Sequence, residues 1–198
     1  MAYLFGSAIV LFVIVTVLLF NREVGRIRAE KAERLASTRE IPDFGLTDQF
    51  GQIVRRRDLI GKVWMAGLVR FSDDRPGAAV DAMSLIVSRV ATIADYRAVL
   101  ISIDPEADTP DQLERFVSLL PNKDKWVALT GKPDRVADLV RVGLGRVVRK
   151  EGHAVRIERS DWIGVVDRKG RLRASFDATG NHFQEQALTA LKHVLSEQ

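Results

Sequence analysis

The first feature of the chain is an uncharged, mostly apolar run, AYLFGSAIVLFVIVTVLLF, from Ala2 to Phe20. At the helical rise of about 1.5 Å per residue, its length nearly matches a bilayer hydrocarbon core of about 30 Å. The run therefore predicts a transmembrane anchor over residues 1–21. A cleaved signal peptide is the main alternative, but no basic segment precedes the run, and LLFNREVG offers no small-residue cleavage pattern.

A charged segment, NREVGRIRAEKAERLASTRE, follows the apolar run. Its acidic and basic residues are interleaved at helix-compatible spacing, which predicts a helical stalk over residues 22–40. Pro42 is expected to stop this helix. The basic residues of the stalk follow the predicted membrane helix, and taken alone this bias favours a cytoplasmic location for the rest of the chain.

The remaining residues, 41–198, alternate apolar runs with helical patterns. GKVWMAGLVRF and RAVLISID are near-continuous apolar runs, as in strands that are covered on both faces. FGLTDQFGQIV predicts an opening hairpin, WVALT a short strand, and an RKG turn joins two late strands. Helical patterns occupy residues 76–96, 110–120, 133–145 and 181–195. The order βαβαβαββα predicts one α/β domain.

Composition narrows the possible functions. Cysteine is absent from all 198 residues, which excludes disulfides, thiolate metal sites and thiol-based catalysis by this chain, including peroxiredoxin chemistry. The 30 basic and 26 acidic residues give a net charge of +4 and are spread along the sequence, without the dense basic stripes of nucleic-acid binders. We therefore expect no nucleic-acid partner.

Two acidic clusters are candidates for chemistry. Asp73 and Asp74 form a carboxylate pair just before a predicted helix, where the simpler interpretation is an N-terminal cap and a partner for the helix dipole. Asp104, Asp108 and Thr109 are interpreted as a strand-end turn followed by a helix cap.

The remaining candidate side chains point to structural roles. The histidines lie far apart in the sequence, so a shared metal site is not expected from His153, His182 and His193. The tryptophans lie in strand-like runs and are predicted to be core residues: Trp64, Trp126 and Trp162.

A resemblance to a known family becomes specific at SIDPEADTPDQL, residues 102–113. This segment is similar to the hallmark of the SCO/SenC proteins, the copper chaperones of cytochrome c oxidase assembly. Other motifs follow in the family's order: the FGLTDQFGQIV hairpin with DLIGK, the strand WVALTG, and the late hairpin SDWIGVVDRKGRL. The resemblance covers roughly residues 41–196 and implies a thioredoxin-like fold behind an N-terminal anchor.

The sequence departs from that family where copper ligands are expected. Family members bind copper through two cysteines of a CxxxC loop and one histidine, and such soft donors suit Cu(I). Here FSDDRPGAA stands in place of the loop, and Arg159, whose guanidinium cannot bind a metal, stands in place of the histidine. We therefore predict no metal and no cofactor, and a candidate interaction surface at the former copper site: Asp73, Asp74, Arg75 and Arg159.

The resemblance and the missing ligands together predict a non-catalytic, SCO-like structural or assembly subunit of a respiratory membrane complex related to cytochrome oxidase. The alternative is a metal-handling assembly factor with an unusual carboxylate and histidine site, which needs Asp73 or Asp74 close to a histidine. The expected partners are membrane lipid, through the N-terminal helix, and subunits of that complex. The family's topology implies a single-pass inner-membrane protein with a periplasmic domain, against the charge bias of the stalk.

Overall fold

The structure, a computed structural model, describes residues 39–73, 77–151, 154–157, 161–178 and 182–197. The chain divides into two compact units, Met1–Ala36 and Ser37–Gln198, and the described residues belong to the second. The predicted anchor and the predicted stalk up to residue 38 therefore lie outside the described residues. None of the described helices is long and apolar enough to cross a membrane.

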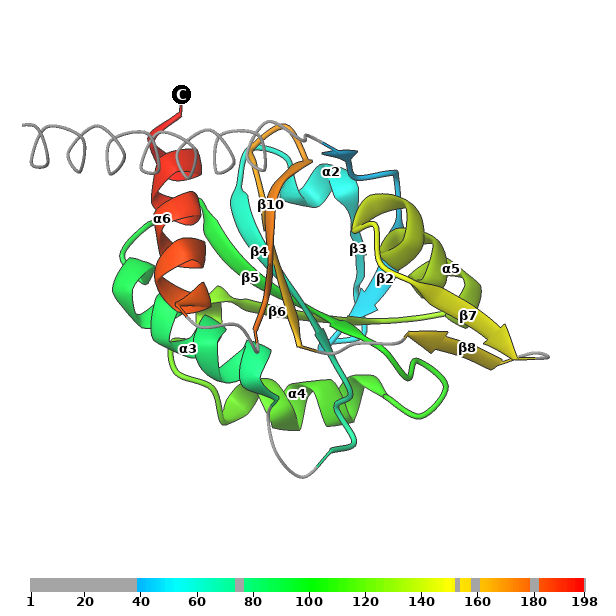
Figure 1. The fold of residues 1–198 in the computed structure, drawn as a ribbon. Helices are drawn as coiled ribbons and strands as arrows, with labels where there is room; N and C mark the ends of the chain where they lie inside the picture. Colours follow the sequence, from blue (N-terminus) through cyan, green and yellow to red (C-terminus); the bar gives the residue numbers. More distant parts are fainter. Residues whose placement is uncertain (1–38, 74–76, 152–153, 158–160, 179–181, 198) are drawn as a thin grey trace, which may run out of the picture. The chain divides into compact units, whose positions relative to one another are not determined.

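The strands that the structure describes form one eight-stranded mixed sheet and a separate two-stranded ribbon. The sheet order is β1-β10-β9-β4-β5-β6-β2-β3, in which β4, β5 and β6 run parallel and the other neighbours run antiparallel. In Figure 1 the strands are β1 (Arg39–Glu40), β2 (Gly45–Asp48), β3 (Ile53–Arg55), β4 (Val63–Val69), β5 (Tyr96–Ser102), β6 (Trp126–Thr130), β9 (Trp162–Val166) and β10 (Arg171–Asp177).

Helices cover both faces of this sheet (Figure 1). One face carries α3, α4 and α6, and the other carries α5 with the π-helical turn η2 that continues it. The short helix α2 follows β3, and the 3₁₀ turn η1 precedes β6. Their bounds are α2 (Arg56–Leu59), α3 (Ala78–Val90), α4 (Pro110–Ser118), η1 (Lys123–Lys125), α5 (Pro133–Asp138), η2 (Leu139–Gly143) and α6 (Phe183–Ser196).

Strand β4 lies in the middle of the sheet, and all seven of its residues are buried because helices cover both faces. Successive side chains of β4 point to opposite faces. Trp64 belongs to the core on the α5 side, together with Leu139 of η2. On the other face α3 approaches so closely that a Cβ built on Gly67 would lie 2.7 Å from Sδ of Met83. The predicted burial of the tryptophans is confirmed for Trp64, Trp126 and Trp162.

Local sequence signals predicted the turns and the cap of α4 correctly. In the β2–β3 hairpin, Oδ1 of Asp48 accepts hydrogen bonds from the backbone N–H groups of Phe50 and Gln52. Gly170, in the turn between β9 and β10, has a φ of +74°, a value that favours glycine. Thr109 is the N-cap of α4, as the sequence suggested, and the structure adds a capping box with Gln112.

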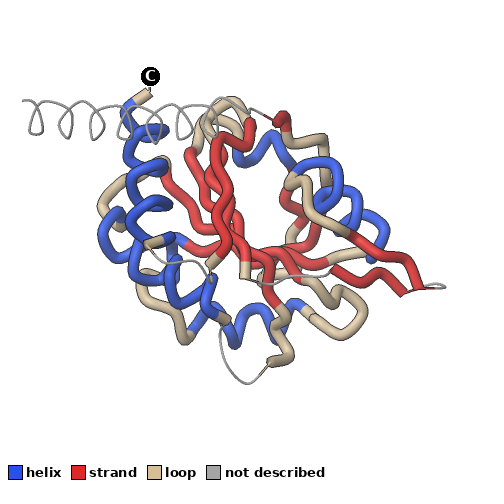
Figure 2. Tube along the Cα trace, viewed as in Figure 1, coloured by secondary structure: helices blue, strands red, loops and turns tan. Residues whose placement is uncertain are grey.

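Several predicted boundaries were wrong. Residues 39–40, predicted as the end of a helical stalk, form β1 and pair with β10. The helix predicted over 76–96 is shorter: α3 begins at Ala78 and ends at Val90. The pattern over 133–145 forms α5 and then a π-helical turn. Strands β7 (Val148–Glu151) and β8 (Ala154–Ile157) pair only with each other and form the ribbon, which was not predicted as separate (Figure 2).

Candidate functional site

The candidate site lies at the carboxyl ends of the parallel strands β4 and β5, the edge where open α/β sheets commonly bind ligands. After β4, the segment Phe71–Asp73 passes beside α4, and residues 74–76 of the same loop lie outside the described residues. The loop after β5 leads into α4 through Asp108 and Thr109. Two loops and one helix therefore meet at this edge.

The buried carboxylate of Asp108 joins these two loops. Its Oδ2 accepts hydrogen bonds from the hydroxyl of Ser102, at 2.6 Å, and from the backbone N–H of Phe71, at 3.2 Å. Its Oδ1 accepts a third from the backbone N–H of Ser72, at 3.1 Å. The backbone carbonyl of Asp108 accepts one more, from the hydroxyl of Thr130 on β6. Asp108 thus fixes the loop after β4 to the end of β5.

The electrostatic state of Asp108 follows from its burial. Removal from water raises the pKa of this carboxyl above its ordinary value, while the hydrogen bonds from Ser102 and the Phe71 and Ser72 amides act in the opposite direction. No arginine or lysine in the described ranges forms an ion pair with it. The nearby Asp104 pairs instead with Arg70, at 3.6 Å, in a partly exposed contact. Asp108 is therefore held by hydrogen bonds and not by a counter-charge.

Sequence reasoning placed Asp104 and Asp108 in a strand-end turn, and the structure agrees, because the backbone N–H of Asp108 donates to the Asp104 carbonyl. It did not find that Asp108 reaches back to Phe71 and Ser72. The only sequence feature that pointed to this role is that the polar Ser102 ends an apolar strand and that Asp108 follows it across the strand-end turn.

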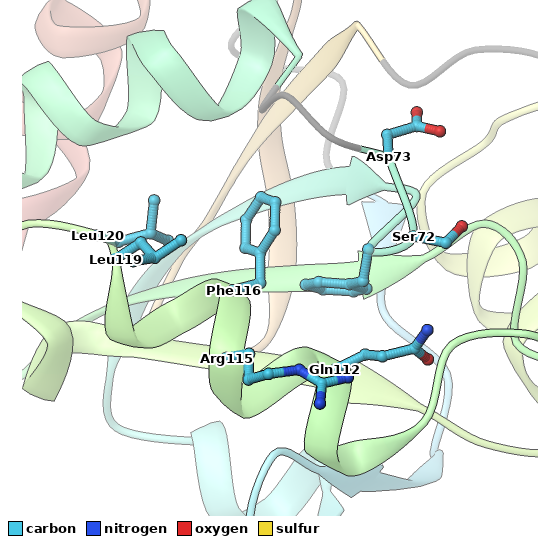
Figure 3. A pocket seen from close by; sticks show the side chains of 8 residues that line it. Ser72, Asp73, Gln112, Arg115, Phe116, Leu119 and Leu120 are labelled. Atoms are coloured by element: carbon cyan, nitrogen blue, oxygen red, sulfur yellow. The ribbon is translucent and has the colours of Figure 1, made fainter.

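A pocket of about 340 Å³ opens between the loop after β4 and the outer side of α4 (Figure 3). We call it the α4 pocket, and it is lined by Phe71, Ser72, Asp73, Gln112, Arg115, Phe116, Leu119 and Leu120. The rings of Phe71 and Phe116 meet edge to face, with 5.2 Å between their centroids. Phe71 is buried, and the backbone N–H groups of this residue and Ser72 are fixed by Asp108. The loop side of the pocket is thus preformed.

The polar groups of the α4 pocket are divided between its two sides. Arg115 and Gln112 project from α4 on one side, and Asp73 projects from the loop on the other (Figure 3). Gln112 Oε1 accepts hydrogen bonds from the backbone N–H and the hydroxyl of Thr109, so its amide nitrogen remains available as a donor. Sequence reasoning missed these residues. The sequence feature that could have indicated the pocket is Leu119, an apolar residue that follows α4 and is off the spacing of its buried residues, Leu113 and Val117.

Of the predicted interaction surface, Asp73 is described, is exposed and lines the α4 pocket. The other predicted residues, Asp74, Arg75 and Arg159, lie outside the described residues. The interpretation of Asp73 as a helix cap is wrong, because the N-cap of α3 is Gly77 and the acidic residue of the first turn is Asp81. Gly77 is in an extended conformation, so α3 starts only after it.

The described ranges contain no group of three or more His, Cys, Asp or Glu residues placed to hold a metal ion. His182 is the N-cap of α6, and His193 lies on the exposed side of that helix, 3.3 Å from Glu197. His153 lies outside the described residues. Neither His182 nor His193 therefore joins Asp73 in such a group of possible metal ligands.

Comparison with known proteins identifies the family. Residues 32–196 match the sequence profile of SCO1/SenC. The chain belongs to the SCO1/SenC family. A SCO1 protein homolog of Bacillus subtilis is 25% identical over 158 residues, covering 77% of this chain and 81% of that protein.

Solved structures of the family share the fold. BsSco, described as a member of the Sco family of cytochrome c oxidase assembly proteins, superposes with a TM-score of 0.68 at 21% identity, covering 82% of this chain and 96% of the other. Copper-bound ScoI of Bradyrhizobium japonicum gives a TM-score of 0.61 at 23% identity, covering 77% and 98%. The thioredoxin-like α/β fold expected from the motifs is therefore confirmed.

Proposed function

We propose that this chain is a membrane-anchored, non-catalytic SCO1/SenC protein that serves as a structural or assembly subunit of a respiratory membrane complex related to cytochrome oxidase. The observation that carries the proposal is the combination of the family match over residues 32–196 with a chain that has no cysteine. Because the family fold is present without any thiol, we infer that the chain acts by binding other proteins and not by thiol chemistry. The assembly role stated for BsSco supports the link to cytochrome c oxidase.

The donor set at the loop after β4 does not fit Cu(I) as a cargo. Cu(I) prefers thiolate, thioether and imidazole ligands. Apart from the Arg70 guanidinium, which cannot bind a metal, the described polar side chains of this loop are the Ser72 hydroxyl and the Asp73 carboxylate, which are hard oxygen donors. The family's route of copper transfer through two cysteines therefore has no chemical basis in this sequence.

The apolar run Ala2–Phe20 supports a single anchor in the inner membrane. The topology expected for the family supports a periplasmic domain. A protease-access assay on spheroplasts tests this placement, with digestion of residues 41–198 expected before the inner membrane is broken. Digestion only after lysis would instead support the charge bias of the stalk.

Purification of the intact complex tests the proposed role. The full-length tagged chain is extracted from its own membranes in mild detergent, and the co-purifying proteins are identified and quantified by mass spectrometry. We expect subunits of a respiratory complex in fixed ratio to the chain. Migration of the chain alone, without stoichiometric subunits, would rule out the subunit role.

Metal analysis tests the alternative of a metal-handling factor. The purified full-length chain is incubated with Cu(I) or Cu(II), desalted and analysed for bound metal. We expect less than stoichiometric copper, because the described donors at the loop are hard oxygens. Tight, stoichiometric copper that is lost in an Asp73→Asn, Asp74→Asn double variant would establish the alternative.

A further inference from the structure

The α4 pocket has the chemistry of a docking site for another protein. We propose that it receives a segment of a neighbouring subunit in which one bulky apolar side chain lies next to one carboxylate. This inference rests on the proposed function, because the occupant is taken to belong to a partner in the same complex. It concerns α4 and the start of the loop, and does not depend on the residues of the former copper site that lie outside the described ranges.

The apolar part of the pocket is open to solvent. Leu119, at the C-terminal end of α4, is 85% exposed, the highest value among the large exposed hydrophobic residues of the described chain. It lies beside Phe116 and Leu120, which are only partly buried, and beside the buried ring of Phe71. Contiguous apolar side chains around a concavity typically mark an interaction site, and aromatic residues in such pockets often contribute much of the binding energy.

On the α4 side of the pocket, the guanidinium of Arg115 and the amide nitrogen of Gln112 are hydrogen-bond donors that have no acceptor among the described residues. Arg115 forms no ion pair with any carboxylate of the described residues, and Gln112 presents its amide nitrogen after its oxygen is used by Thr109. The two residues are three apart on a helix, so their side chains are neighbours. A guanidinium beside an amide donor favours a carboxylate, which can accept hydrogen bonds from both.

Asp73 sets the orientation of the occupant. Its exposed carboxylate stands on the side of the pocket opposite Arg115 (Figure 3). An anion that enters along the loop is repelled by Asp73, while an anion placed over α4 is attracted by Arg115. Such charge arrangements contribute specificity and register more than affinity. The carboxylate of the occupant therefore lies over α4, and its apolar side chain lies against Phe116 and Leu119.

The size of the apolar surface favours a polypeptide over a small carboxylic acid. The cavity volume of about 340 Å³ is at the lower end of small-molecule sites, which lie at about 300–1,000 Å³. Leu119 is nearly fully exposed at the edge of the pocket. A small ligand inside the cavity would leave most of this side chain in water. A protein segment that crosses the rim covers Leu119 as well as the cavity.

Two pairs of variants in the full-length chain test the proposal. Leu119→Ser and Arg115→Glu remove the apolar and the cationic contact, and both residues are exposed. Leu85→Ser and Arg89→Glu are matched controls, since Leu85 and Arg89 are likewise exposed and four residues apart on another helix, α3. Each variant is extracted from membranes in mild detergent, and the subunits bound per chain are measured. We expect a loss of about tenfold for the α4 variants and unchanged binding for the controls.

A photo-crosslinking amino acid at position 119 of the otherwise wild-type chain then identifies the occupant. We expect one main adduct, on a peptide of a co-purified subunit that has a bulky apolar residue beside Asp or Glu. Changing that acidic residue to Lys is expected to weaken the complex with the wild-type chain and to restore binding to the Arg115→Glu variant by about tenfold.

The outcomes separate this inference from the proposed function. If the wild-type chain carries its subunits and both α4 variants carry them equally well, the docking site is wrong and the subunit role stands. An adduct on lipid or on a second copy of this chain would also overturn it. If the wild-type chain purifies alone, the proposed function fails and the docking inference fails with it. Unchanged melting temperatures of the variants show that any loss of binding is not a loss of folding.

Discussion

The most informative single change is Asp108→Asn, because it alters the group that joins the two loops of the site and keeps nearly the same shape. The wild-type carboxylate accepts three hydrogen bonds, from the Ser102 hydroxyl and from the backbone N–H groups of Phe71 and Ser72. An asparagine has one acceptor oxygen and one NH₂ group. In either orientation of the amide, its NH₂ group faces at least one backbone N–H, and that donor loses its acceptor.

The expected cost follows from two opposing effects. A hydrogen bond to a charged group contributes about 1.5–3 kcal/mol, and a buried donor left without a partner costs about 1–3 kcal/mol. Against this, a neutral amide avoids the desolvation of the charge, which is the main reason that the pKa of Asp108 is raised. We expect the loss to exceed the relief and the net destabilisation to be about 2 kcal/mol. For a chain of this size, such a loss lowers Tm by roughly 4–8 °C.

Two measurements on the full-length chain in detergent at pH 7 test this reasoning. Thermal unfolding gives the change in Tm, and amide hydrogen exchange reports on Phe71 and Ser72, whose N–H groups should exchange faster in the variant. Ser102→Ala is the matched control. It removes the hydroxyl donor to Asp108 and the acceptor of the Asp104 backbone N–H, but leaves the N–H groups of Phe71 and Ser72 bound to Asp108. We therefore expect a loss of about 1–2 kcal/mol together with slow exchange at Phe71.

The reasoning would be refuted by an Asp108→Asn variant that melts within about 1 °C of the wild type and keeps slow exchange at Phe71 and Ser72. That result would mean that the loop after β4 is held by its packing, through the contact between Phe71 and Phe116, and not by the buried carboxylate.

Three further predictions concern the rest of the domain. Hydrogen bonds from Arg168 lower the pKa of Asp95 in the folded chain. The pair between Arg168 and Asp95 therefore stabilises the fold above the unfolded-state pKa of about 3.9, and this stabilisation is lost as the pH falls through the folded-state pKa. Arg168→Met should therefore destabilise at pH 7, and its difference from the wild type in urea unfolding should narrow below about pH 4; a gap that widens in acid contradicts this. Gly67→Ala should cost about 1 kcal/mol, because the new methyl group meets the flexible end of Met83, and a Met83→Ala background should reduce that cost. Thr109→Ala should cost about 1 kcal/mol through loss of the α4 cap, and a melting temperature equal to that of the wild type would show that the cap is dispensable.

The elements that the sequence predicted well are those specified by neighbouring residues. The continuous apolar runs of β4 and β5 predicted strands covered on both faces, and both are almost fully buried. The α4 cap was predictable because Thr109 stands directly before Pro110, a pair typical of the start of a helix. The order of the motifs indicated the family, and the family match over residues 32–196 confirms it.

The features that the sequence did not predict depend on residues that meet only after folding. Nothing near Asp108 in the sequence indicates that its carboxylate binds the backbone of Phe71 and Ser72. The contact of Phe71 with Phe116 is equally non-local. Strand β7 (VRKE) has three charged residues, a composition that does not indicate a strand, and its pairing with β8 forms only in the folded chain.

The pairing of β1 with β10 also constrains how the domain is made. Arg39 pairs with Leu172, and the central strand β4 pairs with β9 near the other end of the chain. Contacts between residues so distant in sequence form slowly, because a long loop must close before they contribute. The sheet therefore cannot be completed until β9 and β10 have left the ribosome. A product truncated before Arg171 lacks the partner of both β1 and β9, and we expect it to be degraded rather than to accumulate as a shorter domain.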